Sequence, residues 1–429
     1  MNSLRHPLAR TFAFALAGLA ASGCSTSAHR DFARLAPPAA AAGEGESQQE
    51  RPQNPVPPLI RPAAEPVADL GPLLKRIGER NNIPGFTAVV LRGDRIVAEG
   101  VAGVRRRGTD VAVTIEDRFQ IASCAKAMSA MLIARLVEQG NLKWDQPLTR
   151  YFPDHRLHPD WEKITLRHLI THTAGLRDPL VTFLRSTAFD RGSLMERRRA
   201  FVERVLGSRP GSPAGSPVAY CNIDYILAAA VAEKVTGKPW EQLMAAHVFA
   251  PLGLASGGFG PPGSPGETLQ PWGHGKHRLL QVGILGNAAF DPGARGADYP
   301  AIASPAGYIH LSIRDWAKFV SLHLRAHPAN PNATVAVLRP DTFATLHGTQ
   351  SELSYAGGWN VGTKPWAKGS GPGDRGRVLF HLGDNQRWSS AVWVAPEKDF
   401  AVLIVCNRGD MGKAVDEVAS QIVGTYARR

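Results

Sequence analysis

Ser123 and Lys126 are the two residues whose types and spacing most directly suggest chemistry in this sequence. They lie three positions apart where an apolar, helix-patterned stretch begins within Asp117–Gly140. Positions i and i+3 share one helix face, so the Lys126 amine can approach the Ser123 hydroxyl. A serine hydroxyl is a weak nucleophile at neutral pH, and a nearby amine kept uncharged by burial can accept its proton as it attacks a carbonyl. The pair therefore predicts nucleophilic acyl chemistry.

Ser123 and Lys126 alone do not identify a catalytic site, and further catalytic residues are needed. A Ser and a Lys at this spacing occur about once by chance in a chain of this length, and a serine at a helix start often only caps the helix. Tyr220 and Asn222 stand where a Gly/Pro-rich loop runs into another helical pattern. A phenol there can relay a proton, and an amide can bind a substrate carbonyl or amide.

A third candidate segment, His381-Leu382-Gly383, precedes a strand pattern that begins near Ser389. A glycine at this place lets a substrate lie against the strand edge. It also leaves a backbone N–H that can help the Ser123 N–H to hold an oxyanion. The three segments together can supply a nucleophile, a proton relay and an anion-binding site.

The N-terminus has the pattern of an export signal. Residues 1–23 carry Arg5 and Arg10, an apolar run and small residues just before Cys24. The apolar run is too short to span a bilayer comfortably. The small residues before Cys24 resemble a bacterial lipoprotein cleavage site, although Ala21 stands where Leu is usual. We expect an exported, periplasmic protein that a lipid on Cys24 anchors to the membrane.

Residues 24–66 are rich in Ala, Pro, Gly, Glu and Gln and show no periodic apolar pattern, which predicts a disordered tether. The formal charge of +12 falls to +10 when the two arginines of the leader are subtracted. Basic clusters at 105–107 and 197–199 fit solvated loops better than a surface for anionic lipid or cell-wall polymer. No recognisable nucleic-acid-binding module interleaves basic and aromatic residues, so we do not expect a nucleic-acid partner.

Residues 67–429 have the size of one large two-lobed body. The patterns predict a helix at Asp69–Asn82, a hairpin of Phe86–Leu91 and Arg95–Val101, strands at Ser390–Val394 and Phe400–Cys406, and a final helix at Lys413–Tyr426. Short connections make these strand pairs antiparallel. We expect a mixed α/β fold, with a sheet lobe from 67–120 and 335–429 and an inserted, helix-patterned lobe from roughly 121–334.

The cysteines and histidines leave two questions. Cys124, Cys221 and Cys406 remain after Cys24, and a Cys124–Cys221 disulfide and buried thiols are both compatible with the sequence. His168 and His172 have the i, i+4 spacing of helical zinc ligands, but no third ligand is placed. We therefore expect no metal and no cofactor.

The order Ser-x-x-Lys, Tyr-x-Asn, His-x-Gly resembles the serine β-lactamase-like hydrolases related to class C β-lactamases, D-Ala-D-Ala peptidases and certain esterases. The resemblance covers about residues 70–425 and extends to LRHLITHTAGL (166–176), PLGLASGGFG (251–260), SPAGYIHLSIRDWAKF (304–319) and GGWNVG (357–362). It implies a β-lactamase and penicillin-binding-protein fold, in which helices flank an antiparallel sheet. It also implies a small-molecule or peptide substrate, which can be derived from the cell wall.

Carried over residue by residue, the resemblance implies Ser123 as the acylated nucleophile and Lys126 and Tyr220 as the proton-transfer pair. Asn222, His381, Gly383 and Asp384 would form the substrate-binding set, and the N–H groups of Ser123 and Asp384 the oxyanion hole. Asp384 stands where a small residue is usual, and we expect its carboxylate to point away from that hole.

His381 occupies a position at which many members of the family have Lys. A mostly neutral imidazole attracts a substrate carboxylate less than a lysine does, which disfavours a β-lactamase. Arg387 is the next candidate for such a contact. We expect a serine hydrolase acting on an ester, a D-amino-acid peptide or a β-lactam. A non-hydrolytic penicillin-binding or cell-wall-sensing receptor is the alternative.

Overall fold

Two uninterrupted apolar runs form the centre of the main sheet, namely β2 (Gly85–Arg92) and β13 (Phe400–Cys406), which pair antiparallel. Both strands are buried along nearly their whole length, which explains why their sequences do not alternate. The computed structural model describes residues 59–61, 66–153, 156–177, 192–278, 284–294, 297–298, 300–330, 337–348 and 353–427. Within them, the sheet joins strands from both ends of the chain, as the sequence predicts.

The eight strands follow the order β1-β3-β2-β13-β12-β11-β10-β9. The remaining bounds are Ala68–Asp69 for β1, Arg95–Gly103 for β3, Tyr355–Ala356 for β9, Trp359–Thr363 for β10, Arg377–Asp384 for β11 and Ser389–Ala395 for β12. Neighbouring strands are antiparallel except for the short pair β1 and β3. The two predicted strand pairs, β2 with β3 and β12 with β13, are confirmed.

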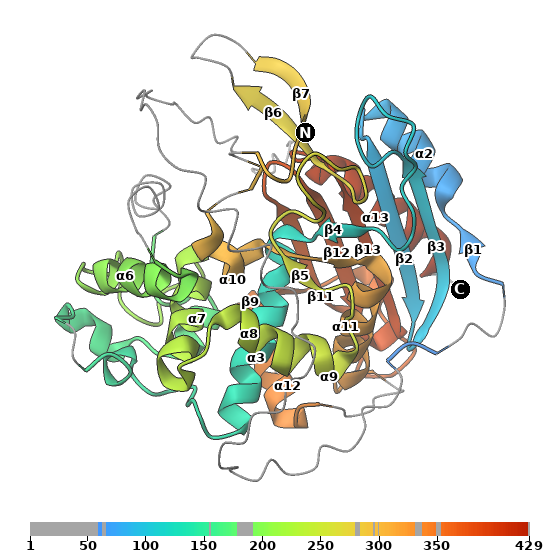
Figure 1. Ribbon diagram of the computed structural model, residues 1–429. Coiled ribbons are helices and arrows are strands. Elements are labelled where there is room, and N and C mark those ends of the chain that lie inside the picture. The colour runs from blue at the N-terminus through green and yellow to red at the C-terminus, as the bar shows by residue number, and fades with distance from the viewer. Residues whose placement is uncertain are drawn as a thin grey trace, which may run out of the picture.

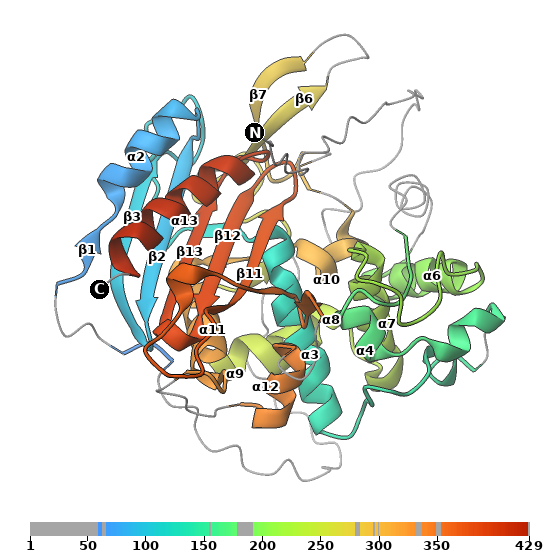
Figure 2. The same cartoon turned by 180° about the vertical axis from the view of Figure 1, so that it is seen from behind.

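Helices cover both faces of this sheet. On one face lie α2 (Gly71–Arg80) and α13 (Gly412–Tyr426), which Figure 2 shows in front of the strands. Their apolar stripes pack against the strand side chains of that face. On the opposite face lies α11 (Ile313–Ala326), which contacts β2, β12 and β13. The first and last helices correspond to those predicted from the sequence.

A group of helices beside the sheet is built around α3 (Lys126–Glu138) and α7 (Asn222–Thr236), as Figure 1 shows. Both helices are apolar around most of their circumference and buried, which is typical of central helices. They pack against each other, so the two ends that carry Lys126 and Asn222 are fixed together. The helices around them are α4 (Leu166–Ile170), α6 (Leu194–Leu206), α8 (Trp240–Met244), α9 (Ala250–Leu252), α10 (Ser304–Gly307) and α12 (Pro340–Leu346).

Short helical segments connect these elements. They are the 3₁₀-helices η1 (Ala122–Ala125), η2 (Leu148–Arg150), η3 (Pro159–Lys163), η5 (Ala301–Ala303), η6 (Pro365–Ala367) and η7 (Pro396–Lys398), and the π-helix η4 (Ala245–Phe249). The middle of the chain differs from the helical pattern expected there, because it also contains strands. β5 (Gly258–Phe259) and β8 (Ile309–Ser312) join β4 (Arg118–Gln120) in a small sheet, and β6 (Gly273–Arg278) pairs with β7 (Ile284–Phe290). β4, β5 and β8 are only two to four residues long, and Gly and His interrupt the apolar alternation of β5, β6 and β8.

The beginning of the described chain corrects the predicted end of the tether. Leu59 is buried, and Arg61 forms a parallel bridge with Arg95 and an ion pair with Asp94. Apolar contact and backbone pairing therefore hold residues 59–61 on the body, although the sequence places them in the tether. The leader and Cys24 lie outside the described residues.

A buried ion cluster ties the helices together at a distance from the sheet. The Arg198 guanidinium on α6 donates to Glu233 on α7 at 2.6 Å and to Glu241 on α8 at 2.7 Å, and all three side chains are nearly inaccessible. The Trp240 N–H also donates to Glu233. Because removing one partner leaves a buried charge unpaired, such a cluster fixes the relative placement of its helices more than it adds net stability.

Three buried histidines lie where the end of α11 meets α12. His323 and His347 are joined by a 2.9 Å hydrogen bond, and the His327 ring stacks on that of His347. Burial lowers the pKa of His323 to about 3 and that of His327 to about 4. Burial also lowers the pKa of His347 well below its usual value.

We predict that acid destabilises the fold through these histidines. Below pH 6.5 His327 binds a proton in the unfolded chain, whereas in the folded chain it stays neutral down to about pH 4. The free energy of unfolding therefore falls as the pH falls. For His327 alone, the loss between pH 7.5 and pH 5 is about 2 kcal/mol. Denaturant unfolding of wild type and His327→Gln at both pH values checks this. Equal losses in the two proteins would contradict it.

Candidate functional site

The candidate nucleophile lies at the turn between β4 and α3. Ala122, the preceding residue, has a left-handed backbone (φ +45°), a conformation that non-glycine residues adopt rarely and at a cost. The turn leaves Ser123 partly exposed, whereas Lys126 is completely buried at the start of α3. The predicted pair is therefore placed with the hydroxyl near solvent and the amine inside the protein.

The Lys126 amine contacts three oxygens. Its Nζ lies 3.3 Å from Ser123 Oγ, 2.8 Å from Asn222 Oδ1 and 2.6 Å from the Ala306 carbonyl oxygen. An uncharged amine can donate its two N–H groups to Asn222 and Ala306 and direct its lone pair at the Ser123 hydroxyl. This arrangement suits an amine that accepts the serine proton.

Tyr220 and Asn222 come to this amine from the loop before α7. The Tyr220 side chain is 45% exposed, and its ring centroid lies 4.8 Å from Lys126 Nζ. Asn222 is the first residue of α7 and reaches Lys126 directly. The structure thus brings together the Ser-x-x-Lys and Tyr-x-Asn segments, which are about 100 residues apart in the sequence.

His381 lies inside the site rather than on an open edge. Its side chain is 3% exposed, its Nδ1–H donates to the Leu382 carbonyl at 2.7 Å, and its Nε2 accepts from the Tyr355 hydroxyl at 3.2 Å. Burial lowers the His381 pKa to about 3. The imidazole is therefore uncharged at neutral pH, as the sequence suggests. Both ring nitrogens of His381 have partners within the protein. This geometry therefore does not favour the predicted role of His381 as a substrate contact.

Gly383 is required for a reason that the sequence did not reveal. A Cβ at this position would lie 2.6 Å from the Ile121 carbonyl oxygen and would also meet Ser390 Oγ. The glycine therefore lets β11 approach the turn that precedes Ser123. This is a contact within the protein, whereas the sequence pattern predicts space for a substrate at this glycine.

The Asp384 carboxylate is turned toward neighbouring loops. It accepts hydrogen bonds from the Ser389 hydroxyl at 2.5 Å, the Gln386 N–H at 2.8 Å and the Asp410 N–H at 2.7 Å. Desolvation by burial raises its pKa. These three donors compensate the carboxylate locally, in agreement with the expectation that it points away. They also fix the end of β11, whose N–H is the second predicted oxyanion donor.

Several contributors to the site were missed by the sequence analysis. Gly358 (φ +87°) packs against the backbone of Lys126 and Ala127, where a Cβ would lie 2.5 Å from the Lys126 carbonyl carbon. Tyr355 holds His381, and the Ala306 carbonyl holds Lys126. Gly358 and Ala306 belong to stretches quoted for the family resemblance, but their contacts depend on tertiary structure that spacing does not reveal.

The remaining cysteine and histidine candidates have structural environments. Cys124 and Cys221 are buried thiols and are not joined by a disulfide, so the thiol alternative is the correct one. Burial raises the pKa of Cys124 to about 12, which makes this thiol unreactive. His168 closes a capping box with Thr165 at the start of α4. His172 lies 2.5 Å from Asp224. Each of these two histidines therefore has a hydrogen-bond partner within the protein.

Arg387 faces a hairpin and not the nucleophile. Its guanidinium carbon lies 3.6 Å from the centroid of the Phe290 ring on β7, and its Nη1 donates to the Gln386 carbonyl. Lys276 on β6 pairs with Asp410 at 3.0 Å, so two ionic or cation–π contacts attach this hairpin to the sheet. Arg387 is thus occupied by contacts within the protein.

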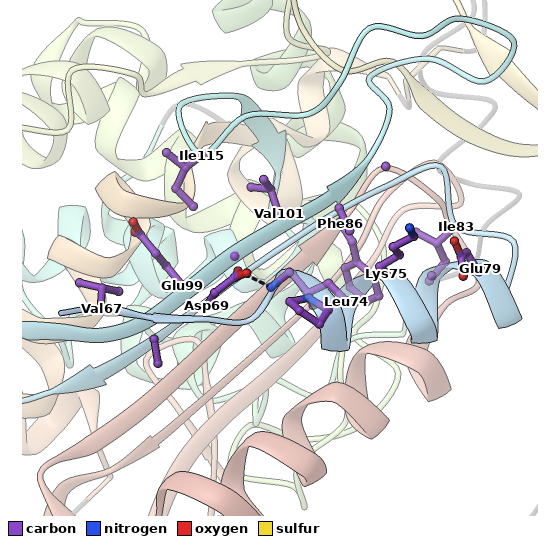
Figure 3. A pocket seen from close by; sticks show the side chains of 17 residues that line it. Val67, Asp69, Leu74, Lys75, Glu79, Ile83, Phe86, Glu99, Val101 and Ile115 are labelled. Carbon is purple, nitrogen blue, oxygen red and sulfur yellow. Dashed lines mark hydrogen bonds between the residues drawn. The ribbon is translucent and has the colours of Figure 1, made fainter.

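A large groove lies elsewhere, between α2 and β3. It has a volume of about 880 Å³, and Figure 3 shows Leu74, Phe86 and Val101 among its apolar lining. None of the candidate catalytic residues lines this groove. The site described above rests on its converging polar groups rather than on this cavity.

Comparisons with known proteins relate this arrangement to a family. The family model described as Beta-lactamase matches residues 71–425. Over 248 residues the chain is 27% identical to Penicillin-binding protein 4 of Amycolatopsis lactamdurans, covering 57% of this chain and 60% of that protein. The chain therefore spans about three fifths of that relative's length.

Two solved structures share the fold. One is the octameric penicillin-binding protein homologue from Pyrococcus abyssi, with a TM-score of 0.65 and 19% identity, covering 82% of this chain and 76% of that one. The other is the D-amino acid amidase from Ochrobactrum anthropi SV3 complexed with L-phenylalanine, with a TM-score of 0.62 and 19% identity, covering 84% and 98%. At these identities the likeness concerns the fold alone.

We predict that Gly383→Ala impairs the reactivity of Ser123. The added Cβ would push β11 away from Ile121, and a displacement of about 1 Å at a reacting centre can cost roughly a hundredfold in rate. The measurement is the rate of Ser123 labelling by a fluorophosphonate. The matched control is Gly362→Ala on β10, where the nearest atom to the new Cβ is 3.9 Å away. Equal labelling rates in the two variants would contradict the assigned role of Gly383.

Proposed function

We propose, on the premise that this chain belongs to the beta-lactamase family, that it is a serine hydrolase that forms an acyl-enzyme on Ser123. The observation that carries the proposal is the position of the buried Lys126 amine, 3.3 Å from Ser123 Oγ and held by Asn222 and Ala306. A buried amine next to a serine hydroxyl is the arrangement that proton removal from this nucleophile needs.

The proposed reaction uses the residues in a fixed sequence. The Ser123 proton passes to the Lys126 amine while Oγ bonds to the substrate carbonyl carbon, whose π electrons move to the oxygen. The N–H groups of Ser123 and Asp384 stabilise this oxyanion. When the tetrahedral intermediate collapses, the leaving group takes the proton through Tyr220. Water, deprotonated by the same pair, then attacks the acyl carbon, releases the acid and restores the serine.

The charges around the site favour an uncharged acyl donor. His381 is neutral because burial lowers its pKa to about 3. Arg387 is engaged with Phe290. Neither residue is therefore arranged to attract a substrate carboxylate, which a β-lactam or a D-alanyl peptide presents. We infer that short-chain esters are the preferred substrates.

We also propose that the protein is exported and anchored through a lipid on Cys24. The support is the sequence of residues 1–24, with its two arginines, apolar run and small residues before the cysteine. Among the residues that the structure describes, no helix is long and apolar enough to cross a bilayer. A lipid on Cys24 would hold the body at the membrane without a spanning helix.

A substrate panel and a Ser123→Ala variant test the proposed nucleophile and the inferred substrate class together. Purified protein should hydrolyse p-nitrophenyl esters faster than D-alanyl peptides or a chromogenic cephalosporin. Ser123→Ala should lower ester turnover by about a thousandfold or more, as losses of catalytic nucleophiles do. A fluorophosphonate should add mass to the peptide that contains Ser123. Faster cephalosporin turnover would overturn the inferred substrate class, and labelling of Ser123→Ala would overturn the nucleophile. Stoichiometric labelling without turnover would identify a receptor.

A further prediction concerns the anchor. In a bacterial host that processes lipoproteins, Cys24→Ser should leave the membrane fraction and lose incorporation of labelled fatty acid, because the acyl chains provide the membrane affinity. Cys406→Ser serves as the control, since that thiol is buried in β13. Membrane retention of the Cys24→Ser protein would show that lipidation is not the anchor.

A further inference from the structure

His172 occupies an unusual backbone position directly behind the candidate site. It follows the end of α4 with a left-handed backbone (φ +56°). A glycine would adopt this conformation without cost, whereas a histidine carries backbone strain there. The conformation also directs the His172 carbonyl oxygen at the Ala219 N–H, at 2.9 Å. The His172 backbone thus holds the residue immediately before Tyr220.

The side chain of His172 holds the other side of the same segment. Its Nδ1–H donates to the Asp224 carboxylate on the first turn of α7 at 2.5 Å. This strong contact directs the Nδ1 proton at Asp224, so Nδ1 is a poor acceptor for a second hydrogen bond. The Cys221 N–H lies 3.4 Å from Nδ1 and therefore contributes little as a donor. The ring centroid lies 4.7 Å from that of Tyr220. His172 therefore contacts Tyr220 through its ring and fixes the chain on both sides of it.

This pair is fully enclosed. The His172 and Asp224 side chains are 0% and 1% exposed, and within the described residues His172 Nε2 is buried without a hydrogen-bond partner. A buried nitrogen without a hydrogen-bond partner destabilises the folded state. A histidine in this place thus brings both backbone strain and an unsatisfied polar atom. A residue that served only to pack the interior would need neither the strained backbone nor the unsatisfied nitrogen.

The groups packed around His172 belong to the candidate site. Tyr220 and Tyr225 approach from α7 and its loop, and Tyr355 approaches from β9 at 4.5 Å between ring centroids. Lys126 and His381 are also close enough to interact with it. Burial keeps the His172 pKa well below its usual value. The imidazole is therefore neutral and presents an uncharged face to Tyr220.

We propose that His172 and Asp224 form a positioning pair that holds Tyr220 against Lys126. The proposal rests on the proposed function, because it assigns a purpose to the placement of the Tyr220 phenol. The pair acts through Tyr220 and transfers no proton itself. Its effect is confined to the step in which the Tyr220–Lys126 pair handles the serine proton.

The test is a double-mutant cycle on the full chain. His172→Asn is chosen because asparagine tolerates a left-handed backbone and can still donate to Asp224, while the ring contact with Tyr220 is lost. The readout is the maximal rate of Ser123 labelling at saturating fluorophosphonate, measured separately from the labelled fraction. We expect His172→Asn to lower this rate about tenfold, a difference of about 1.4 kcal/mol, with the labelled fraction unchanged.

If His172 acts through Tyr220, His172→Asn should have no further effect in a Tyr220→Phe background, where the phenol is already absent. Asp224→Asn should slow labelling in the same direction and supplies a second variant if His172→Asn does not fold. The matched control is His323→Asn, which truncates another buried histidine between α11 and α12. It should lower the melting temperature while leaving the labelling rate within about twofold.

The outcomes separate this inference from the proposed function. If the wild type is labelled at Ser123 and His172→Asn reacts at the wild-type rate, only the positioning pair is overturned. Additive effects of His172→Asn and Tyr220→Phe would also overturn it, because the histidine would then act independently of the phenol. If the wild type is not labelled at Ser123, the proposed function fails first and the positioning pair with it.

Discussion

The burial of one amine sets the conditions for the rest of this structure. Lys126 is completely inaccessible, and burying its amine away from water is costly unless protein oxygens replace the solvent. Those oxygens come from Ser123, Asn222 on α7 and Ala306 on α10. Three segments far apart in sequence must therefore converge on one nitrogen, and a displacement of any one leaves a buried polar group unsatisfied. The same constraint that fixes the helices also fixes the nucleophile.

Close backbone contact between the sheet and the nucleophile depends on glycine. Gly383 lets β11 touch the Ile121 carbonyl, and Gly358 lets the segment between β9 and β10 touch the backbone at Lys126. Gly307 lies against the backbone of Ala122 and Ser123, with its hypothetical Cβ 3.2 Å from the Ala122 carbonyl carbon. These contacts bring the end of β11 and the nucleophile turn together. Side chains at these positions would separate the two parts that the proposed oxyanion hole needs to have adjacent.

The sequence was sufficient for the parts of the fold that carry strong local patterns. The runs that became β2 and β13 are long and apolar, and the stripe on α13 has clear helical period, so their types and pairing were predictable. The short strands β5 and β8 were not, because two to four residues containing Gly or His carry no period. Leu59 was predicted to belong to the tether, because the residues that bury it are brought near only when the body folds.

For the candidate site, residue types and order were predictable, but orientation was not. Motif spacing identified Ser123, Lys126, Tyr220 and Asn222, and the structure brings the amine within reach of both the serine and the asparagine. The burial of His381 and its hydrogen bond with Tyr355 could not be read from His-x-Gly, because they depend on which face of β11 is covered. The sequence singled out His172 only for its i, i+4 spacing from His168, because its contacts with Asp224 and Tyr220 span about 50 positions.

The buried groups around Lys126 determine the charge of the candidate site. Burial keeps His172 and His381 neutral, and the Asp384 carboxylate is satisfied by donors from its own neighbourhood. The Lys126 amine is therefore surrounded by neutral imidazoles and phenols, with Asp224 behind His172 as a buried carboxylate. In a site of low polarity, hydrogen bonds gain strength and a substrate with its own unpaired charge is costly to admit. The low polarity of the site is thus the common basis of the proposed proton transfer to Lys126 and of the proposed preference for uncharged acyl donors.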